Sequence, residues 1–137
     1  QVGFENREKF FGSLHAPHGW HEEKFAELMD TNNFFITLDT THLAHSDGDI
    51  LTFFTKNKKR IINIHLSDYK PHMFNGSLRP FRYKHLPLGK GVLPIKAFLQ
   101  LLKKEKYDGL LTMEISTDLA GLVDSAKIIQ SVFKKTS

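Results

Sequence analysis

Four apolar segments along the chain alternate with stretches in which apolar residues recur at helical spacing. Each apolar segment is short and rich in β-branched or aromatic residues, as strands are. The predicted strands are QVGFEN (1–6), FFITLD (34–39), RIINIHLSD (60–68) and GLLTMEIS (109–116). The predicted helices cover 21–33, 48–60, 94–108 and 118–135, the third entered at Pro94, a residue that suits the first turn of a helix. The order strand then helix therefore repeats four times.

The predicted strands are near-continuous apolar runs rather than alternations of apolar and polar residues. Such runs are typical of parallel strands covered by helices, and consecutive strand and helix units join parallel neighbours by right-handed crossovers. We therefore expect an α/β protein whose four strands form a parallel sheet. No glycine-rich phosphate-binding motif follows the first strand, which argues against a dinucleotide-binding sheet.

Composition narrows the class of protein. The 137 residues are 40% hydrophobic and 25% charged, which suits one globular domain over residues 1–137. No apolar run approaches the roughly 20 residues that a membrane span needs, so no membrane association is expected. The absence of cysteine removes disulfides and thiolate chemistry and is consistent with a cytoplasmic protein. A net charge of +4 permits partners that carry phosphate, including nucleic acid, although a lysine-rich solvated surface is the commoner cause.

A residue able to bind a cation stands at the end of every predicted strand. These residues are Glu5, Asp39, His65 and Glu114. The carboxyl ends of parallel strands open on one face of the sheet, where active sites of α/β proteins form. Three carboxylates and one imidazole suit Mn²⁺, Mg²⁺ or Co²⁺, with Zn²⁺ as an alternative. The competing interpretation is that these acids are only helix caps and surface residues of the loops.

The segments GFEN, TLDTTH, NIHLSDYK, HLPLGKG and LTMEIS, in this order and at these separations, resemble the second half of the xylose isomerase-like TIM barrels. This superfamily joins sugar isomerases and epimerases with abasic-site nucleases of the endonuclease IV type, also called AP endonuclease family 2. The resemblance covers essentially the whole chain and implies strands five to eight of an eight-stranded barrel, a C-terminal half barrel. A complete barrel takes about 250 residues. We therefore expect a fragment of a longer protein, with a dimer of half barrels or an open, inactive sheet as alternatives.

The resemblance also implies residue roles. In the epimerase branch the four strand-end residues Glu5, Asp39, His65 and Glu114 would hold one divalent metal ion. Glu5 and Glu114 would in addition be the catalytic pair, moving a proton at the carbon beside a carbonyl of a small sugar or sugar phosphate through an enediolate. The residues expected to contact the substrate are His42, Asp68, Lys70, Arg82 and His85.

The nuclease branch uses three zinc ions, whose extra ligands include histidines from the first half of the barrel and an Asp-x-His pair. Here His85 is present, but Tyr83 stands two positions before it. The loop YKPHMFNGSLRPFRYKH is nevertheless basic and aromatic, as a nucleic-acid groove would be. A metal-dependent sugar isomerase or epimerase is the preferred hypothesis, with a nuclease and an inactive metal-binding or interaction module as alternatives.

Overall fold

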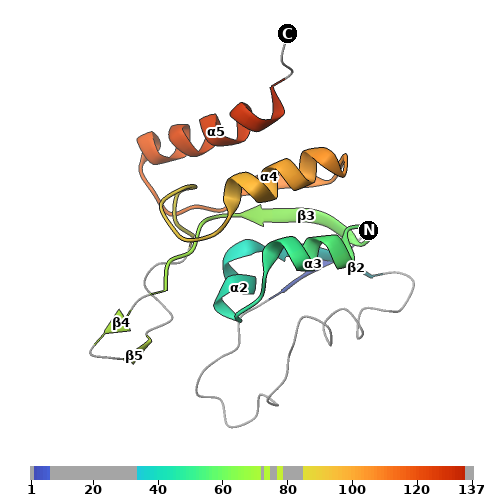
Figure 1. The fold of residues 1–137 in the computed structure, drawn as a ribbon, viewed down its shortest axis with the longest axis horizontal. Coiled ribbons are helices and arrows are strands. Elements are labelled where there is room, and N and C mark those ends of the chain that lie inside the picture. Colours follow the sequence, from blue (N-terminus) through green and yellow to red (C-terminus); the bar gives the residue numbers. More distant parts are fainter. Residues whose placement is uncertain (1, 7–33, 72, 75–76, 79–84, 135–137) are drawn as a thin grey trace.

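The computed structural model describes residues 2–6, 34–71, 73–74, 77–78 and 85–134 (Figure 1). Within these residues, four strands form one parallel sheet in the order β1-β2-β3-β6. The strands are β1 (Val2–Glu5), β2 (Phe34–Asp39), β3 (Ile61–Leu66) and β6 (Leu110–Met113). The predicted parallel α/β arrangement is therefore confirmed, with each strand beside its predecessor. The predicted helix at 21–33 and the predicted substrate contact Arg82 lie outside the described residues.

Three of the described helices follow strands at the predicted places. They are α3 (Ile50–Asn57), α4 (Ile95–Lys104) and α5 (Leu119–Phe133). The side chain of Asp49 caps α3 by accepting from the Thr52 N–H at 2.7 Å, and Asp118 caps α5 in the same way through Gly121 at 2.9 Å. Such caps satisfy backbone donors that have no partner inside the helix. Among the described residues, no helix is long and apolar enough to cross a membrane.

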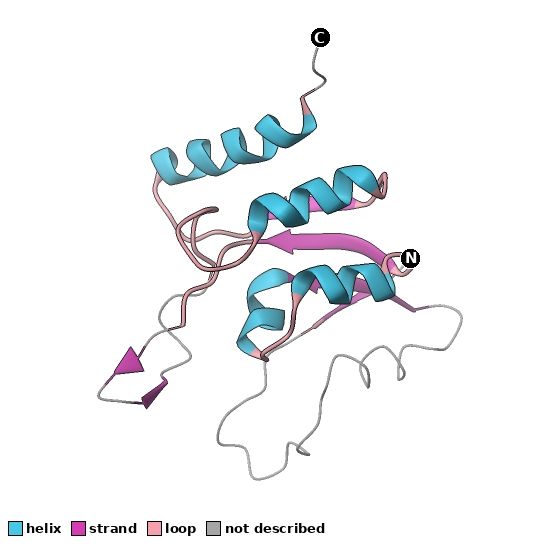
Figure 2. Ribbon diagram, in the orientation of Figure 1, coloured by secondary structure: helices cyan, strands magenta, loops and turns pink. Residues whose placement is uncertain are grey.

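Two features go beyond the sequence prediction (Figure 2). A helix of one and a half turns, α2 (Thr40–His45), leaves β2 directly, and a small antiparallel pair joins β4 (Met73–Phe74) to β5 (Ser77–Leu78). The sequence does not predict α2, because six residues are too few to show a helical period. Its start is decided by Asp39, whose side chain accepts from the His42 N–H.

One face of the sheet carries the hydrophobic core. Ile36, Leu38, Ile64 and Leu66 are buried there. They belong to one cluster with apolar residues of α3 and α4, namely Phe53, Phe54, Phe98, Leu99 and Leu102. Figure 1 shows α3 and α4 running beside β3, with α5 next to α4. Within the described residues, this cluster contains the apolar burial that stabilises the fold.

Near the carboxyl ends of the strands, the other face of the sheet is polar. Successive side chains of a strand point to opposite faces, so the residues between the core positions are Thr37, Asp39, Asn63 and His65. The register pairs Glu5 with Thr37, Asp39 with His65, and His65 with Thr112. In a parallel pair, aligned residues share a face. The strand-end residues therefore gather on one face and at one end of the sheet.

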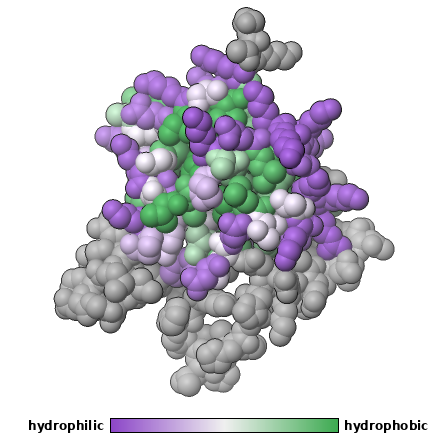
Figure 3. All heavy atoms as spheres, in the orientation of Figure 1, coloured by the Kyte–Doolittle hydropathy of each residue, from purple (hydrophilic) through white to green (hydrophobic). Residues whose placement is uncertain are grey.

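Strands β1 and β6 are the edges of the described sheet. Leu110 on β6 is 69% exposed, and four apolar residues of α5 are also exposed, namely Leu119, Leu122, Val123 and Phe133. Figure 3 shows apolar side chains reaching the surface among hydrophilic ones on the helix-bearing side. Edge strands and apolar surface of this kind are typical of a sheet that pairs with further structure.

Candidate metal centre

Three of the four predicted metal ligands meet at the carboxyl ends of neighbouring strands. Glu5 ends β1, Asp39 ends β2, and His65 is the fifth residue of β3. Each offers one ligand atom, and the three atoms lie within 4.8 Å of one another. The register explains this meeting, because Asp39 is aligned with His65 and Glu5 lies on the adjoining strand. Cation binding is the chemistry that such a group of oxygen and nitrogen donors suits.

Glu114, the fourth predicted ligand, follows β6 and reaches the same imidazole. Its Oε2 lies 2.7 Å from Nδ1 of His65, and Oε2 of Glu5 lies 3.6 Å from the same nitrogen. Carboxylates from the first and last strands of the sheet thus converge on one ring atom. Glu114 is outside the group whose ligand atoms all lie within 4.8 Å of one another, so its carboxylate must turn to complete a four-ligand shell.

Two buried polar atoms at the centre make no hydrogen bond within the described part of the chain. They are Oδ2 of Asp39 and Nδ1 of His65. Nδ1 of His65 has ion-pair contacts with two carboxylates, at 2.7 Å from Glu114 and 3.6 Å from Glu5, without a hydrogen bond to either. Buried polar atoms normally have partners, so two such atoms at the meeting point of acids need an explanation. Donor atoms gathered within 4.8 Å of one another fit a divalent cation, and the residues present therefore suit the predicted metal.

Asp39 is the residue around which the centre is built. It is fully buried; its Oδ1 accepts from the His42 N–H at 2.8 Å, while Oδ2 lies 3.8 Å from Nε2 of His42. Asn6 holds its backbone from both sides, because the Asn6 amide donates to the Asp39 carbonyl at 3.1 Å and accepts from the Asp39 N–H at 2.7 Å. Burial raises the pKa of Asp39 above its ordinary value of 3.8, against the opposing effect of the hydrogen bond from His42. A bound cation would offset that cost of burial.

Two of the predicted substrate contacts, His42 and His85, line the same centre. Nε2 of His42 lies 3.5 Å from Glu5 Oε1 and 3.8 Å from Asp39 Oδ2. The His85 ring packs edge-on against the His42 ring with centroids 5.4 Å apart. Asp39, His42 and His85 form a second group of possible ligands within 4.8 Å, which shares Asp39 with the first. The two histidines therefore lie beside the group formed by Glu5, Asp39 and His65.

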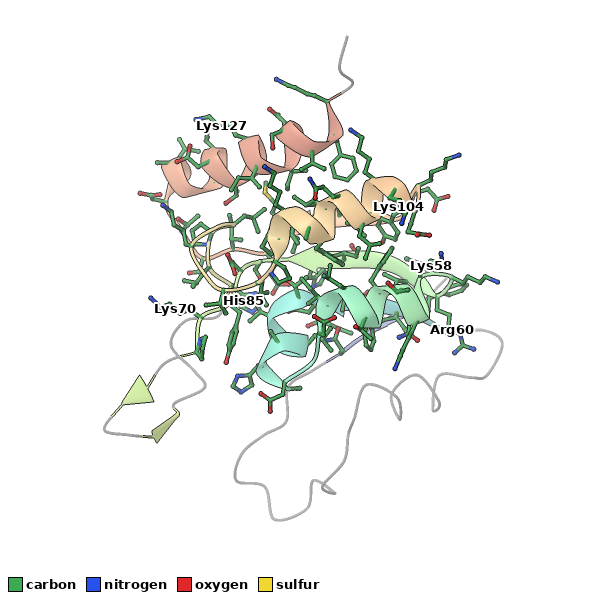
Figure 4. All side chains as sticks on the ribbon, in the orientation of Figure 1. Lys58, Arg60, Lys70, His85, Lys104 and Lys127 are labelled. Carbon is green, nitrogen blue, oxygen red and sulfur yellow. The ribbon has the colours of Figure 1, made fainter. Side chains whose placement is uncertain are left out.

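Lys70 and Asp68 differ in their surroundings. Lys70 is exposed, and Figure 4 places it with His85 at one end of the molecule, opposite Lys58, Arg60 and Lys104. Asp68 is fully buried, and both of its carboxylate oxygens accept hydrogen bonds from backbone N–H groups. Lys70 is thus free to reach solvent at the site end, whereas the contacts of Asp68 favour a role in shaping the loop beside it.

A network of buried hydroxyl groups under the centre was not singled out by the sequence reasoning. Thr40 Oγ1 donates to the Ser67 carbonyl at 2.7 Å and accepts from the Ser67 N–H at 3.0 Å. Thr41 Oγ1 lies 2.7 Å from Ser67 Oγ. These bonds join the start of α2 to the segment that follows β3. The signal in the sequence is the polar pair that directly follows Asp39, but hydroxyl residues are so common after strands that it predicts little by itself.

Comparisons with known proteins identify the family of this chain. The family model for the xylose isomerase-like TIM barrel matches residues 2–132, and the chain belongs to that family. An inosose dehydratase of Mesomycoplasma hyopneumoniae (strain 7448) is 30% identical in an alignment that covers 70% of this chain and 35% of that protein. The chain thus spans about a third of the length of the curated relatives that it matches.

Solved structures give the same fold. A D-tagatose 3-epimerase-like protein superimposes with a TM-score of 0.70 at 27% identity, covering 96% of this chain and 46% of that one. A probable 3-DHS dehydratase of Bacillus anthracis superimposes with a TM-score of 0.67 at 18% identity, covering 98% and 50%. The chain therefore has the fold of part of a TIM barrel. Its assignment to strands five to eight stays a prediction.

Proposed function

We propose that this chain carries the metal centre of a divalent-metal-dependent sugar or sugar phosphate isomerase or epimerase. The observation that carries the proposal is the convergence of Glu5 and Glu114 on Nδ1 of His65, with the buried Asp39 carboxylate in the same cluster. Similarity to a D-tagatose 3-epimerase-like protein and to inosose dehydratase supports a small polyol or sugar as the substrate.

The four strand-end residues Glu5, Asp39, His65 and Glu114 would hold the cation. When bound, the cation supplies Lewis acidity, which makes the proton beside a substrate carbonyl easier to remove. Mn²⁺, Mg²⁺ and Co²⁺ fit the three carboxylates and one imidazole, and Zn²⁺ is an alternative.

Glu5 and Glu114 are the proposed acid and base. Their side chains are 29% and 44% exposed, so each can reach a substrate from the open side of the sheet, whereas the fully buried Asp39 cannot. In this mechanism one glutamate takes the proton from the carbon beside the carbonyl, and the other returns a proton to the resulting enediolate. His42 and His85 hydrogen-bond substrate oxygens near the centre, while Lys70 and Arg82 serve the distal end of the substrate.

The proposed site also needs further structure around it. Edge strands β1 and β6 and the exposed apolar residues of α5 would be covered by the other half of a barrel, or by a second copy of this chain. The preferred partner is an N-terminal half barrel in the same protein, because the solved relatives are about twice as long as the aligned region.

The test begins with metal binding by the intact protein. After dialysis against a chelator, calorimetric titration with Mn²⁺ should show one site per chain, and Glu5→Gln with Glu114→Gln should weaken it strongly. Lys127→Gln is the control, since Lys127 pairs with Asp124 on the exposed surface of α5. Ketoses incubated with the loaded protein in deuterated water should gain deuterium at the carbon beside the carbonyl. Metal binding without exchange would leave the inactive binding module as the better account.

An abasic-site nuclease is the second candidate. The observation that favours it is the pair of overlapping ligand groups that share Asp39, because a nuclease of this family needs more than one cation. Cleavage of a duplex with a single abasic site, together with binding of more than one Zn²⁺ per chain, would favour this candidate over the isomerase.

A further inference from the structure

Asp68 lies two residues beyond β3, and its buried carboxylate binds four backbone N–H groups. Oδ1 accepts from Tyr69 at 2.8 Å and from Leu93 at 3.1 Å. Oδ2 accepts from Gly89 at 2.9 Å and from Gly91 at 2.8 Å. Hydrogen bonds to a carboxylate are stronger than those between neutral groups. One side chain therefore gathers the whole turn from Gly89 to Leu93 against the end of β3.

Backbone contacts close the same loop. Asp68 and Leu86 exchange two N–H to carbonyl bonds, each of 2.9 Å, and the Val92 N–H donates to the Tyr69 carbonyl at 2.8 Å. Glycine is required at position 91, because an added Cβ would lie 2.3 Å from Asp68 Oδ1 and 2.3 Å from the Tyr69 carbonyl oxygen. The carboxylate and the loop thus fit each other closely enough to exclude the smallest side chain.

His85 begins this loop, and its ring reaches the metal centre. Its backbone has a φ of 54°, a left-handed conformation that costs energy in a residue with a side chain, so its surroundings must hold it. The Ser116 N–H donates to the His85 carbonyl at 2.7 Å. Nδ1 lies 3.1 Å from the Glu114 carbonyl oxygen and 3.3 Å from Ser67 Oγ. These contacts place the ring beside Glu114, and the next residue, Leu86, ties the backbone of His85 to Asp68.

We propose that Asp68 is a positioning residue, which fixes the loop at 85–93 and thereby holds the His85 ring at the metal centre without contacting the substrate. The catalytic part of this inference rests on the proposed function, whereas the loop geometry does not. This role differs from a direct contact with the substrate, for which neither oxygen of Asp68 has a free approach in the described structure.

The test compares Asp68→Asn with the unchanged intact protein. Asparagine keeps the size but replaces one acceptor oxygen by an N–H donor, which would face backbone donors. Hydrogen exchange of the Gly89, Gly91 and Leu93 amides should be at least about tenfold faster, as loss of charged hydrogen bonds implies. The His85 ring resonances should shift, and turnover should fall by about tenfold or more because a catalytic contact is misplaced. Mn²⁺ affinity should stay within about twofold, because all four proposed ligands remain.

Two further variants make the result decisive. Gly91→Ala keeps the carboxylate but forces the loop away, so it should also give faster amide exchange, shifted His85 resonances and reduced turnover. This variant replaces Asp68→Asn in the test if Asp68→Asn does not fold. Asp49→Asn alters an exposed carboxylate that also accepts a backbone N–H, at the start of α3, and should change none of the readouts.

Two results would overturn the inference. A raised KM with unchanged loop amides would mean that Asp68 contacts the substrate. Faster loop exchange with an unchanged His85 ring and unchanged turnover would mean that the loop does not position the histidine. If the unchanged protein isomerises no sugar, the proposed function fails, but the amide and ring measurements still decide whether Asp68 positions His85.

Discussion

Alternate residues of the same strands point to the two faces of the sheet, and the two faces differ in burial and in chemistry. On β2 and β3, Ile36, Leu38, Ile64 and Leu66 are buried against helices, while Thr37, Asp39, Asn63 and His65 face the other way. The first set gives the sheet its stability, and the second carries the candidate metal centre. Because both sets lie on the same strands, changes in one can be compared with changes in the other while the backbone is held constant.

The largest effect on stability is expected from a substitution in the core, where Phe98 of α4 belongs to the same apolar cluster as the buried strand residues. Phe98 is fully buried and packs edge-on against Phe54, with ring centroids 5.8 Å apart. Phe98→Ala should lower the free energy of unfolding by about 3–5 kcal/mol, measured by urea denaturation, because a large cavity remains in the core. The folded fraction should still bind Mn²⁺ with nearly unchanged affinity. A large loss of affinity in folded protein would show that the two faces are not independent.

Asp39→Asn is expected to lower the affinity for metal while the fold persists, the opposite of the result expected for Phe98→Ala. The amide oxygen can still cap α2, so the fold should persist, but a charged ligand is lost. Mn²⁺ affinity should fall by about 100-fold or more, beyond the range typical of residues that only support a ligand. Isothermal calorimetry measures this directly, with Asp118→Asn at the exposed cap of α5 as the matched control. Retained affinity would remove Asp39 from the proposed ligand set.

Asn6→Ala is expected to have a smaller effect, which lowers both the stability of the fold and the affinity for metal. The variant leaves the buried N–H of Asp39 without its acceptor at 2.7 Å. An unsatisfied buried donor costs about 1–3 kcal/mol, which should appear in the free energy of unfolding. Mn²⁺ affinity should also decrease, because the backbone that carries Asp39 is no longer held. If stability changes alone, Asn6 is a structural residue and not a support of the centre.

The smallest expected effect is a change in how the stability of the metal-free protein depends on pH. Burial raises the pKa of Asp39 in the metal-free fold, so the folded protein holds this proton more tightly than the unfolded chain does. Its contribution to stability is therefore present below the ordinary pKa of 3.8 and is lost as pH rises through the folded value. Asp39→Asn should remove that loss. Without metal, the stability of Asp39→Asn relative to the unchanged protein should be greater at about pH 7 than at about pH 4. Saturating Mn²⁺ should reverse the order at neutral pH.

Much of the fold could be predicted from the chain because the local signals agree with the final structure. The order of strands and helices and the four strand-end residues follow from apolar runs and from the geometry of parallel sheets. The start of β2 at Phe34 and its end at Asp39 match the predicted bounds. Helix α2 and the pair of β4 with β5 were missed because both are too short to show periodicity.

The sequence predicts the members of the candidate site but not the contacts that each of them makes. Strand ends are visible in a sequence, so Glu5, Asp39, His65 and Glu114 could be named as one group. The same reasoning placed Asp68 with the substrate contacts, since an exposed acid and an acid that binds four backbone amides look alike in a sequence. Only the return of the loop at 85–93 onto β3 distinguishes them.

The sequence by itself determined the parallel α/β order and the presence of a residue able to bind a cation at each strand end, because strand propensity and side-chain alternation are local properties. Tertiary structure alone decided which atoms meet. The register of β1, β2 and β3 brings three potential ligand atoms within 4.8 Å, and the buried Asp68 carboxylate accepts hydrogen bonds from the distant Gly89, Gly91 and Leu93. Both depend on contacts between residues far apart in the chain, which no local pattern encodes.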